Sequence, residues 1–237
     1  MVGRAARNVT HSAINKATNM AAKKSIRHHC SEPAEKLSNV SARMRATLLE
    51  AAVEIVNQGR LPSVTEIAHE AGVSRATAYR HFPTRARLIA DLTDYSLGPV
   101  RSWVSEHEDG FDRVMELFEN TFPRFKEYET QLRAALLLSL EHQMLAEAGV
   151  LKEAQYKRGF RRNLLTEAAK PLKATLGKRR FDRLIRALSL IYGIESYVVF
   201  KDIWDASTAE TEATARWMAQ ALLRQALAEV GVDCPFA

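Results

Sequence analysis

The stretch Ser63–Phe82 constrains the fold more than any other part of the chain. Ser63 and Glu66 have the spacing of a capping box, in which the hydroxyl accepts from the backbone N–H of Glu66 and the carboxylate reaches back. Gly72 stands where the helix needs a residue with a left-handed backbone to end it, and Ser74 is suited to cap a new helix. The pattern therefore predicts two short helices joined by a tight turn.

The second of these helices has few core-sized apolar side chains. Ala68 allows a close crossing, and Val73, Ala78 and Phe82 are placed to face inward. The outward face then carries Arg75, Ala76, Tyr79 and Arg80. Such a face can enter the major groove of DNA, and the N-terminal turn of the helix presents free N–H groups to phosphate. The pair is therefore interpreted as a helix-turn-helix.

Helical periodicity continues through the rest of the chain, without the alternation typical of strands. The first helix is expected from Ser41 to just before Gly59, and residues 132–143 are expected to be helical and buried on most sides. Further helices are expected at 84–106 with a kink at Gly98-Pro99, 110–126, 150–176 with a break near Pro171, 178–204 and 208–230. The predicted fold class is all-α.

Positive charge is concentrated in the first third of the chain. Residues 1–38 hold seven Lys and Arg against two Glu, a net charge of +5, and residues 39–90 hold seven Arg against four Glu, a net charge of +3. Since the total is +6, residues 91–237 carry −2. The distribution fits either binding of a polyanion or a solvated basic arm without a partner.

Several classes of protein are not indicated. The hydrophobic content of 46% can fill a core, but no apolar run is long enough to cross a membrane. The N-terminus lacks a signal peptide, and two distant cysteines, Cys30 and Cys234, suggest no disulfide framework, so a cytoplasmic location is expected. The triplet His28-His29-Cys30 does not make a closed metal site. No catalytic motif is found, so we expect no enzyme, metal or cofactor.

The segment "VTEIAHEAGVSRATAYRHFPTRARLIADL" resembles the DNA-binding domain of the tetracycline-repressor (TetR/AcrR) family, with Ala78 where a larger aliphatic residue is frequent. The resemblance covers about 41–92 and implies three parts: a basic flexible arm (1–38), a three-helix DNA-binding domain (39–90) and a larger helical domain (91–237) for ligand binding and dimerisation. The resemblance also extends to the spacing of the last two helices.

Roles in DNA binding can be assigned residue by residue. Arg75 and Arg80 can bond guanine in a bidentate manner or contact phosphate. Ala76 and Thr77 are small enough to approach bases closely. By resemblance Tyr79 and His81 contact the DNA backbone, the alternative for Tyr79 being a half-buried core ring. Further phosphate candidates are Thr65, Ser74, Arg85, Arg43 and Arg45.

The large domain is expected to hold the ligand and the dimer interface. Aromatic residues at helical spacing are usually core, but the resemblance implies that some line an apolar cavity. The candidates, with one polar anchor, are Trp103, Phe118, Phe122, Phe125, His142, Tyr156 and Phe160. The dimer candidates on the last two expected helices are Leu184, Leu188, Ile191, Ile194, Val198, Trp217, Ala221 and Leu222.

Two functions fit these features. The first is a homodimeric repressor that binds a pseudo-palindromic operator and is released by an apolar or amphipathic small molecule. The alternative is a nucleoid-type DNA-binding protein that responds to no ligand, with the basic arm supplying sequence-independent affinity.

Overall fold

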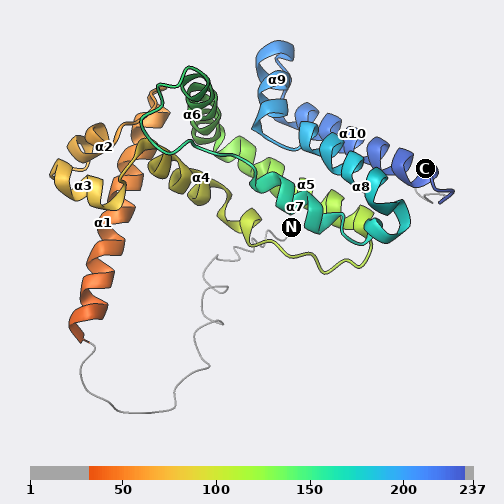
Figure 1. Ribbon diagram of the computed structural model, residues 1–237, viewed down its shortest axis with the longest axis horizontal. Helices are drawn as coiled ribbons and strands as arrows, with labels where there is room; N and C mark the ends of the chain where they lie inside the picture. Colours follow the sequence, from red (N-terminus) through yellow and green to blue (C-terminus); the bar gives the residue numbers. More distant parts are fainter. Residues whose placement is uncertain (1–31, 233–237) are drawn as a thin grey trace, which may run out of the picture. The chain divides into compact units, whose positions relative to one another are not determined.

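The computed structural model describes residues 32–232, with side chains from residue 39 onward. Within these residues it contains helices and no strand, so the predicted all-α class is confirmed. The chain divides into two units, residues 1–41 and 42–237, and the contacts reported below belong to the second. The helices in Figure 1 are α1 (Glu32–Asn57), α2 (Val64–Glu70), α3 (Arg75–His81), α4 (Arg85–Arg101), α5 (Gly110–Glu127), α6 (Glu129–Glu147), α7 (Phe160–Ala168), α8 (Leu172–Ile191), α9 (Ile194–Trp204) and α10 (Thr208–Ala228).

The first helix begins earlier than the sequence indicated. α1 starts at Glu32 rather than near Ser41, so the end of the predicted arm is helical. Pro33 is compatible with this start, because the first N–H groups of a helix have no acceptor within it. The rest of the predicted arm, with the His28-His29-Cys30 triplet, lies outside the described residues, as does Cys234.

The helix-turn-helix packs around a small core of its own. Ala78 and Phe82 are completely buried there, as predicted from their spacing. The buried members of this first core are Leu48, Ala51, Ala52, Ile55, Val64, Ile67, Ala68, Ala78, Phe82 and Leu88. We call the part of the chain built on this core, residues 42–84, the head.

The helix α4 takes part in three hydrophobic clusters in succession. Leu88 belongs to the core of the head. One residue later Ile89, with Leu92, packs in a second cluster that also contains residues of α1 and α6. Val100 near the end of the helix lies in the large C-terminal core. The head and the larger domain are therefore joined through the buried sides of one helix.

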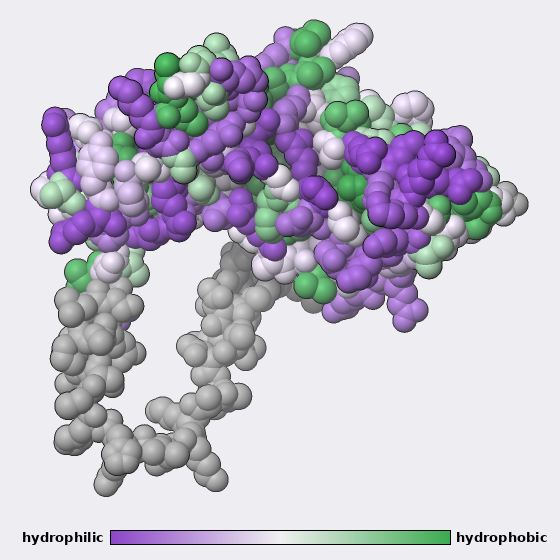
Figure 2. All heavy atoms as spheres, in the orientation of Figure 1, coloured by the Kyte–Doolittle hydropathy of each residue, from purple (hydrophilic) through white to green (hydrophobic). Residues whose placement is uncertain are grey.

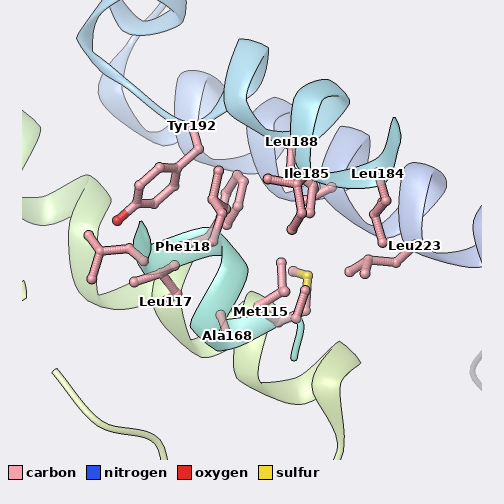
Figure 3. Close-up of a cluster of buried hydrophobic side chains, with 14 of the residues drawn as sticks. Met115, Leu117, Phe118, Ala168, Leu184, Ile185, Leu188, Tyr192 and Leu223 are labelled. Atoms are coloured by element: carbon pink, nitrogen blue, oxygen red, sulfur yellow. The ribbon is translucent and has the colours of Figure 1, made fainter. Parts of the chain in front are cut away.

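The third and largest core fills the C-terminal domain. Phe118 of α5, Leu188 of α8 and Leu223 of α10 are completely buried or nearly so. Figure 3 shows these side chains converging from separate helices, with Tyr192 at one edge of the cluster. The predicted helices at 110–126 and 208–230 correspond closely to α5 and α10.

The fourth helix ends earlier than predicted, at Arg101 instead of Glu106. Pro99 lies near its end and has no N–H to donate to the carbonyl four residues earlier, that of Tyr95. The guanidinium of Arg124 lies beside this turn, donating to the carbonyl of Ser96 at 2.8 Å and more weakly to that of Tyr95 at 3.5 Å. A side chain from α5 therefore satisfies backbone groups near the end of α4.

The prediction that residues 132–143 are buried on most sides was wrong. Leu132 and Leu138 are buried, but Leu137 is 55% exposed and Leu140 is 53% exposed. Only one side of α6 packs on the other helices, so its apolar residues are divided between core and surface. Figure 2 shows hydrophobic residues at the surface among mainly hydrophilic ones. None of the helices in residues 32–232 is long and apolar enough to span a membrane.

Residues 150–159 form a loop and not the start of a helix, which corrects the helix predicted over 150–176. Tertiary contacts hold the loop. The backbone N–H of Tyr156 donates to Nδ1 of the buried His142 at 3.0 Å, and the Tyr156 hydroxyl lies 3.2 Å from that of Thr93. Glu153 accepts from the backbone N–H of Ala86 at 3.2 Å. The loop therefore makes hydrogen bonds to α4 and α6 in place of the backbone hydrogen bonds of a helix.

The helix predicted over 178–204 is two helices, α8 and α9, separated at Tyr192-Gly193. Gly193 is extended, and a Cβ there would overlap the guanidinium of Arg161. That guanidinium donates to the carbonyls of Ser189 at 3.1 Å and Tyr192 at 3.3 Å, which lie at the end of α8. Arg161 thus caps α8, and glycine leaves room for it.

Replacement of Phe82 tests the core of the head. Because the ring is completely buried, Phe82→Ala should lower the free energy of unfolding by about 3–5 kcal/mol in denaturant titrations followed by circular dichroism. The control is Tyr79→Ala on the exposed side of α3, the helix that Phe82 follows, which should change stability by less than about 0.5 kcal/mol. Equal losses in the two variants would contradict the assignment of faces.

Candidate nucleic-acid interface and internal cavity

The turn between α2 and α3 has the predicted chemistry. Gly72 has a φ of 65°, in the left-handed region. The next N–H, that of Val73, donates to the carbonyl of Ala68 at 2.9 Å and closes the turn. The N–H of Thr77 donates to the hydroxyl oxygen of Ser74 at 3.1 Å, which confirms Ser74 as the cap of α3. The orientation of α3 is therefore fixed at its first turn.

The predicted capping box of α2 is also present. The N–H of Ser63 donates to the Glu66 carboxylate at 2.9 Å, and the N–H of Glu66 donates to the Ser63 hydroxyl oxygen at 3.1 Å. These bonds from Ser63, with a smaller contribution from Arg60, hold the pKa of Glu66 below its usual value. The carboxylate therefore stays charged, and the box stays closed, at neutral pH.

The outward face of α3 is exposed as the sequence indicated. Arg75, Ala76, Tyr79 and Arg80 are all exposed, while Thr77 is half-buried. Tyr79 is 46% exposed, which favours a surface role over the alternative of a core ring. α3 thus has a short polar face that is exposed and an opposite face that is buried against the head.

The arginines of this region differ in whether a carboxylate within the chain neutralises their charge. Among the described residues, Arg60 pairs with Glu66 and Arg87 with Asp91. Within the same part of the chain, no carboxylate pairs with Arg75 or Arg80. An arginine without a carboxylate keeps its donors and its charge available for an anionic partner.

Hydroxyl groups help to position one of these arginines. The hydroxyls of Ser74 and Thr77 lie 2.9 Å apart, and Nη2 of Arg80 donates to that of Thr77 at 3.2 Å. The guanidinium of Arg80 is therefore held along the helix, and its remaining donors have no partner within the described residues.

Other predicted phosphate contacts surround this face. Thr65, in the first turn of α2, lines a surface hollow together with Arg75. His81 is half-buried at the end of α3, and Arg43 is exposed on α1. Exposure leaves Arg43 available to DNA, although no contact in the described residues orients it.

Arg45 is placed differently from its prediction as a phosphate contact. Its guanidinium pairs with Asp91 on α4, lies 5.0 Å from the centre of the Phe82 ring and donates to the carbonyl of His81 at 3.4 Å. The Asp91 carboxylate is largely buried and also meets Arg87 at 3.2 Å. Arg45 therefore joins α1 to α4, a pairing between residues distant in sequence that spacing could not reveal.

Arg85 is likewise engaged within the chain. Its guanidinium pairs with Glu141 of α6, so it joins the start of α4 to the large domain. His142, the predicted polar anchor for a ligand, is also engaged within the chain. Glu141 faces Arg85, and His142 is buried and bonded to the loop.

The large domain contains a cavity of about 440 Å³. A volume of this size is sufficient for a small organic ligand. Of the seven predicted pocket residues, three line it, namely Phe125, Tyr156 and Phe160. Phe118 and Phe122 are core residues instead, and Trp103 packs against the same core. The spacing of the aromatic residues therefore indicated which domain holds the cavity. It did not distinguish the residues that line the cavity from those that fill the core.

Sequence reasoning missed the polar side of the cavity. Polar and charged residues of α4, α5 and α7 and of the loops that follow α6 and α8 line it: Thr93, Asp94, Arg101, Thr121, Lys157, Arg158, Arg161, Asn163 and Tyr192. One sequence signal was available, the basic run around Phe160 in "KRGFRR". In the described residues no group of three His, Cys, Asp or Glu side chains is placed to hold a metal ion.

The predicted dimer residues fall into two groups. Leu184, Leu188 and Ile194 are buried in the core of their own chain, and Ile191, Val198 and Leu222 pack against it. The three buried residues leave little surface for a partner, whereas Ile191, Val198 and Leu222 are half-buried and their assignment stays a prediction. Trp217 is 67% exposed, and Ala221 is exposed on the same helix. Large exposed apolar residues that were not predicted are Leu190, Ile203 and Trp204.

Comparison with known proteins agrees with this architecture. Residues 48–92 match the family model described as bacterial regulatory proteins, tetR family. The fold is similar to a TetR transcriptional regulator from Rhodococcus, with a TM-score of 0.50 and 17% identity over 77% of this chain and 96% of that one.

Two curated relatives are similar over a shorter stretch. They are described as the nucleoid occlusion factor SlmA of Shewanella woodyi and of Shewanella sediminis, and each is 33% identical over 78 residues. The match covers 31% of this chain and 37% of each relative, so the chain spans little more than a third of their length. Together with the helix-turn-helix and the all-helical fold, the family model confirms the predicted resemblance to the TetR family of bacterial regulatory proteins over residues 48–92.

Proposed function

We propose that this protein is a ligand-responsive transcriptional repressor. It binds a pseudo-palindromic operator as a homodimer, and a small molecule in the cavity of the large domain releases it. The observation that carries the proposal is the exposed face of α3, where Arg75 and Arg80 have no carboxylate partner in the described residues. Arginine in such a position can bond guanine with two parallel hydrogen bonds.

The cap and the buried side of α3 hold the helix in a fixed orientation, which supports a role in recognising base sequence. Ser74 fixes the first turn, and Ala78 and Phe82 fix the buried side. Arg75 then lies in the first turn of the helix, where residues of recognition helices contact base edges. Tyr79 and His81 are left to contact the phosphate backbone and set the register.

Dimerisation would use apolar side chains near the C-terminal end of the chain. Leu190 of α8, Ile203 and Trp204 of α9 and Trp217 of α10 are 67–77% exposed. A two-fold pairing would cover such residues symmetrically. It would also present two copies of α3 to half-sites about one turn of DNA apart.

A chain of contacts supports communication between the cavity and the head. Tyr156 lines the cavity and bonds through its backbone to His142 and through its hydroxyl to Thr93 of α4. Glu153 of the same loop accepts from Ala86 at the start of α4. A ligand that displaces the loop would change the support of α4, and hence the spacing of the two heads.

The energy that this mechanism requires is modest. To move a two-state equilibrium from 1:99 to 99:1, a ligand must favour one state by about 5.5 kcal/mol. The affinity of a small molecule for a largely apolar cavity can supply a few kcal/mol of such preference. A preference of that smaller size shifts the equilibrium only in part, so the ligand should weaken DNA binding without abolishing it.

A nucleoid-type DNA-binding function is the second candidate. Its support is the similarity to proteins described as nucleoid occlusion factors, together with the net charge of +5 in residues 1–38. This function and the repressor differ in whether a small molecule changes DNA affinity. They differ also in how much of the affinity depends on base sequence, because counterion release from phosphates is blind to sequence.

Arg75→Ala tests the proposed reading helix. The variant should lose about 1–3 kcal/mol of binding free energy on its preferred site and show relaxed preference at one base position in each half-site. Fluorescence anisotropy with single-base variants of the site would measure both effects. The matched control is Arg179→Ala on α8, which removes the same charge outside the head. A loss that is equal on preferred and random DNA would make Arg75 a phosphate contact.

Arg45→Ala tests the internal role of that arginine. Because Asp91 would keep only Arg87 as a partner, stability should fall by about 1–3 kcal/mol in denaturant titrations. The DNA affinity of the folded fraction should stay unchanged. The double variant Arg45→Met, Asp91→Leu should recover part of the stability, since neither charge is then left alone. Unchanged stability with weakened DNA binding would restore Arg45 as a phosphate contact.

His142→Ala tests whether the loop 150–159 depends on its bond to α6. Loss of the acceptor for the Tyr156 N–H should open the loop more often, by about tenfold. Trypsin should then cut faster after Lys157 and Arg158, and the thermal transition of the whole protein should also fall, because the buried ring leaves a cavity. The control is Gln155→Ala, which removes a hydrogen bond between exposed side chains of the same loop and α6. Equal cleavage of both variants would show that His142 does not hold the loop.

A further inference from the structure

Positive charge is concentrated in one short segment of the C-terminal domain. Residues 170–186 hold seven Lys and Arg against one Asp, a net charge of +6. Because residues 91–237 carry −2 in total, the rest of this domain carries −8. A basic segment of this kind attracts anions to its surface, since the like charges that it holds close together repel one another.

The helix α8 presents part of this charge on its exposed side. Its buried side is apolar and includes Phe181 and Leu184. Arg179, Arg183 and Arg186 are exposed and follow one another at i, i+4 and i+7, the spacing of one helix face. We call these three residues the arginine row, which is about 10 Å long at a rise of about 1.5 Å per residue. Like charges at this spacing destabilise a helix, and an anion bound among them would relieve the repulsion.

The arginine row borders a hollow in the surface. Four arginines and one carboxylate line this hollow, namely Arg179, Arg180, Arg183, Arg186 and Glu229. Glu229 directly follows α10, which packs beside α8 (Figure 1). The volume of about 440 Å³ falls in the range of about 300–1,000 Å³ that is typical of small-molecule sites. All five lining residues are charged, so the hollow has no wall suited to a hydrophobic ligand.

The carboxylate neutralises only part of the charge around the hollow. Glu229 pairs with Arg183, and its carboxylate lies 3.6 Å from Nε of Arg180. The hydrogen bond from Arg183 holds the pKa of Glu229 below its usual value, so the carboxylate is charged at neutral pH. Within the described part of the chain, no carboxylate pairs with Arg179 or Arg186. The lining residues therefore keep a net charge of +3.

Linked phosphates are the anions that fit this arrangement. A guanidinium can donate two parallel hydrogen bonds to phosphate oxygens, and it binds phosphate in a fixed orientation. Arg179 and Arg186 stand at the two ends of the arginine row, so a chain of phosphates can bond both ends at once. An acidic peptide would bring apolar and backbone groups into a hollow that is lined by charged side chains.

We propose that the arginine row, with Arg180 beside it, binds a polyphosphate chain, such as tripolyphosphate or the phosphate groups of a nucleoside triphosphate. Arg179 and Arg186 hold the ends of the chain, and Arg183 shares its donors between Glu229 and a phosphate oxygen. The hollow has no lining residue in common with the cavity of the large domain. The site is therefore independent of that cavity and of the release of DNA by a ligand bound there.

The test is isothermal titration calorimetry on the full chain without DNA, at one fixed salt concentration because salt screens exposed charges. Tripolyphosphate should bind at least about tenfold more tightly than inorganic phosphate, since it reaches both ends of the arginine row. ATP distinguishes the two sources of a phosphate chain. We expect it to bind as tightly as tripolyphosphate, because the lining offers no apolar surface for a base. Tighter binding of ATP would identify a nucleotide as the ligand of the same site.

Arg179→Gln combined with Arg186→Gln should weaken the binding of tripolyphosphate at least about tenfold. Glu229→Gln should have the opposite effect and strengthen it, because the variant removes the carboxylate that competes for Arg183. The gain of affinity cannot come from unfolding, so this variant decides the question if thermal melting shows that the arginine double variant is unfolded.

The matched control is Arg75→Gln combined with Arg80→Gln, which removes the same charge from the exposed face of α3. This control should leave the affinity for tripolyphosphate within about twofold. An equal loss in the two double variants would overturn the proposal, because the ligand would then respond to net charge alone. Equal affinities for phosphate and tripolyphosphate, or an affinity that Glu229→Gln does not raise, would also overturn it.

Nucleic acid is the other polyanion that the arginine row could contact. The control variant of α3 provides the comparison, because it lacks both arginines of the proposed reading face. If the further loss of Arg179 and Arg186 in this variant abolishes its remaining affinity for random duplex DNA, the arginine row contacts nucleic acid and the small-ligand proposal is wrong. We expect that remaining affinity to change by less than about twofold.

Discussion

The burial of α4 is the constraint on which the rest of the structure depends. Leu88 is inserted in the core of the head, Ile89 and Leu92 in the cluster with α6, and Val100 in the large C-terminal core. Packed interiors respond to displacement as whole units, because they contain few voids that could absorb it. A movement of α4 therefore cannot stay local to any one of its three environments.

The same helix also carries the polar links. Arg85 and the N–H of Ala86, at its start, bond to Glu141 and Glu153 of the large domain. Further along, Thr93 and Arg101 line the cavity. One side of the helix thus lines the cavity, while its first turn follows directly on α3. The arrangement allows a change in the cavity to reach the DNA-binding face through a single rigid element, with no long relay of side chains.

Local chemistry made part of this structure predictable from the sequence. The capping box at Ser63, the left-handed Gly72 and the cap at Ser74 depend on neighbours within a few residues, and all were predicted correctly. The burial of Ala78 and Phe82 followed from helical spacing alone.

Features set by distant contacts were not predictable in this way. The loop at 150–159 has helix-forming residues, but bonds to His142 and Thr93 outweigh the local preference. Arg45 and Arg85 have the composition of phosphate contacts, and only the fold brings Asp91 and Glu141 beside them. Leu137 and Leu184 are both leucines on apolar helices, yet one is exposed and the other buried, because tertiary packing decides which side of a helix is covered.

The central claim is that the exposed face of α3 reads base sequence. The most direct measurement is selection of bound duplexes from a fully random DNA pool by the full-length protein, followed by affinity measurements at one fixed salt concentration. The account predicts enrichment of a two-fold symmetric site that binds at least about 10³-fold more tightly than random DNA. Failure to enrich any site, with equal affinity for selected and random duplexes, would contradict it and leave sequence-independent binding as the function of the head.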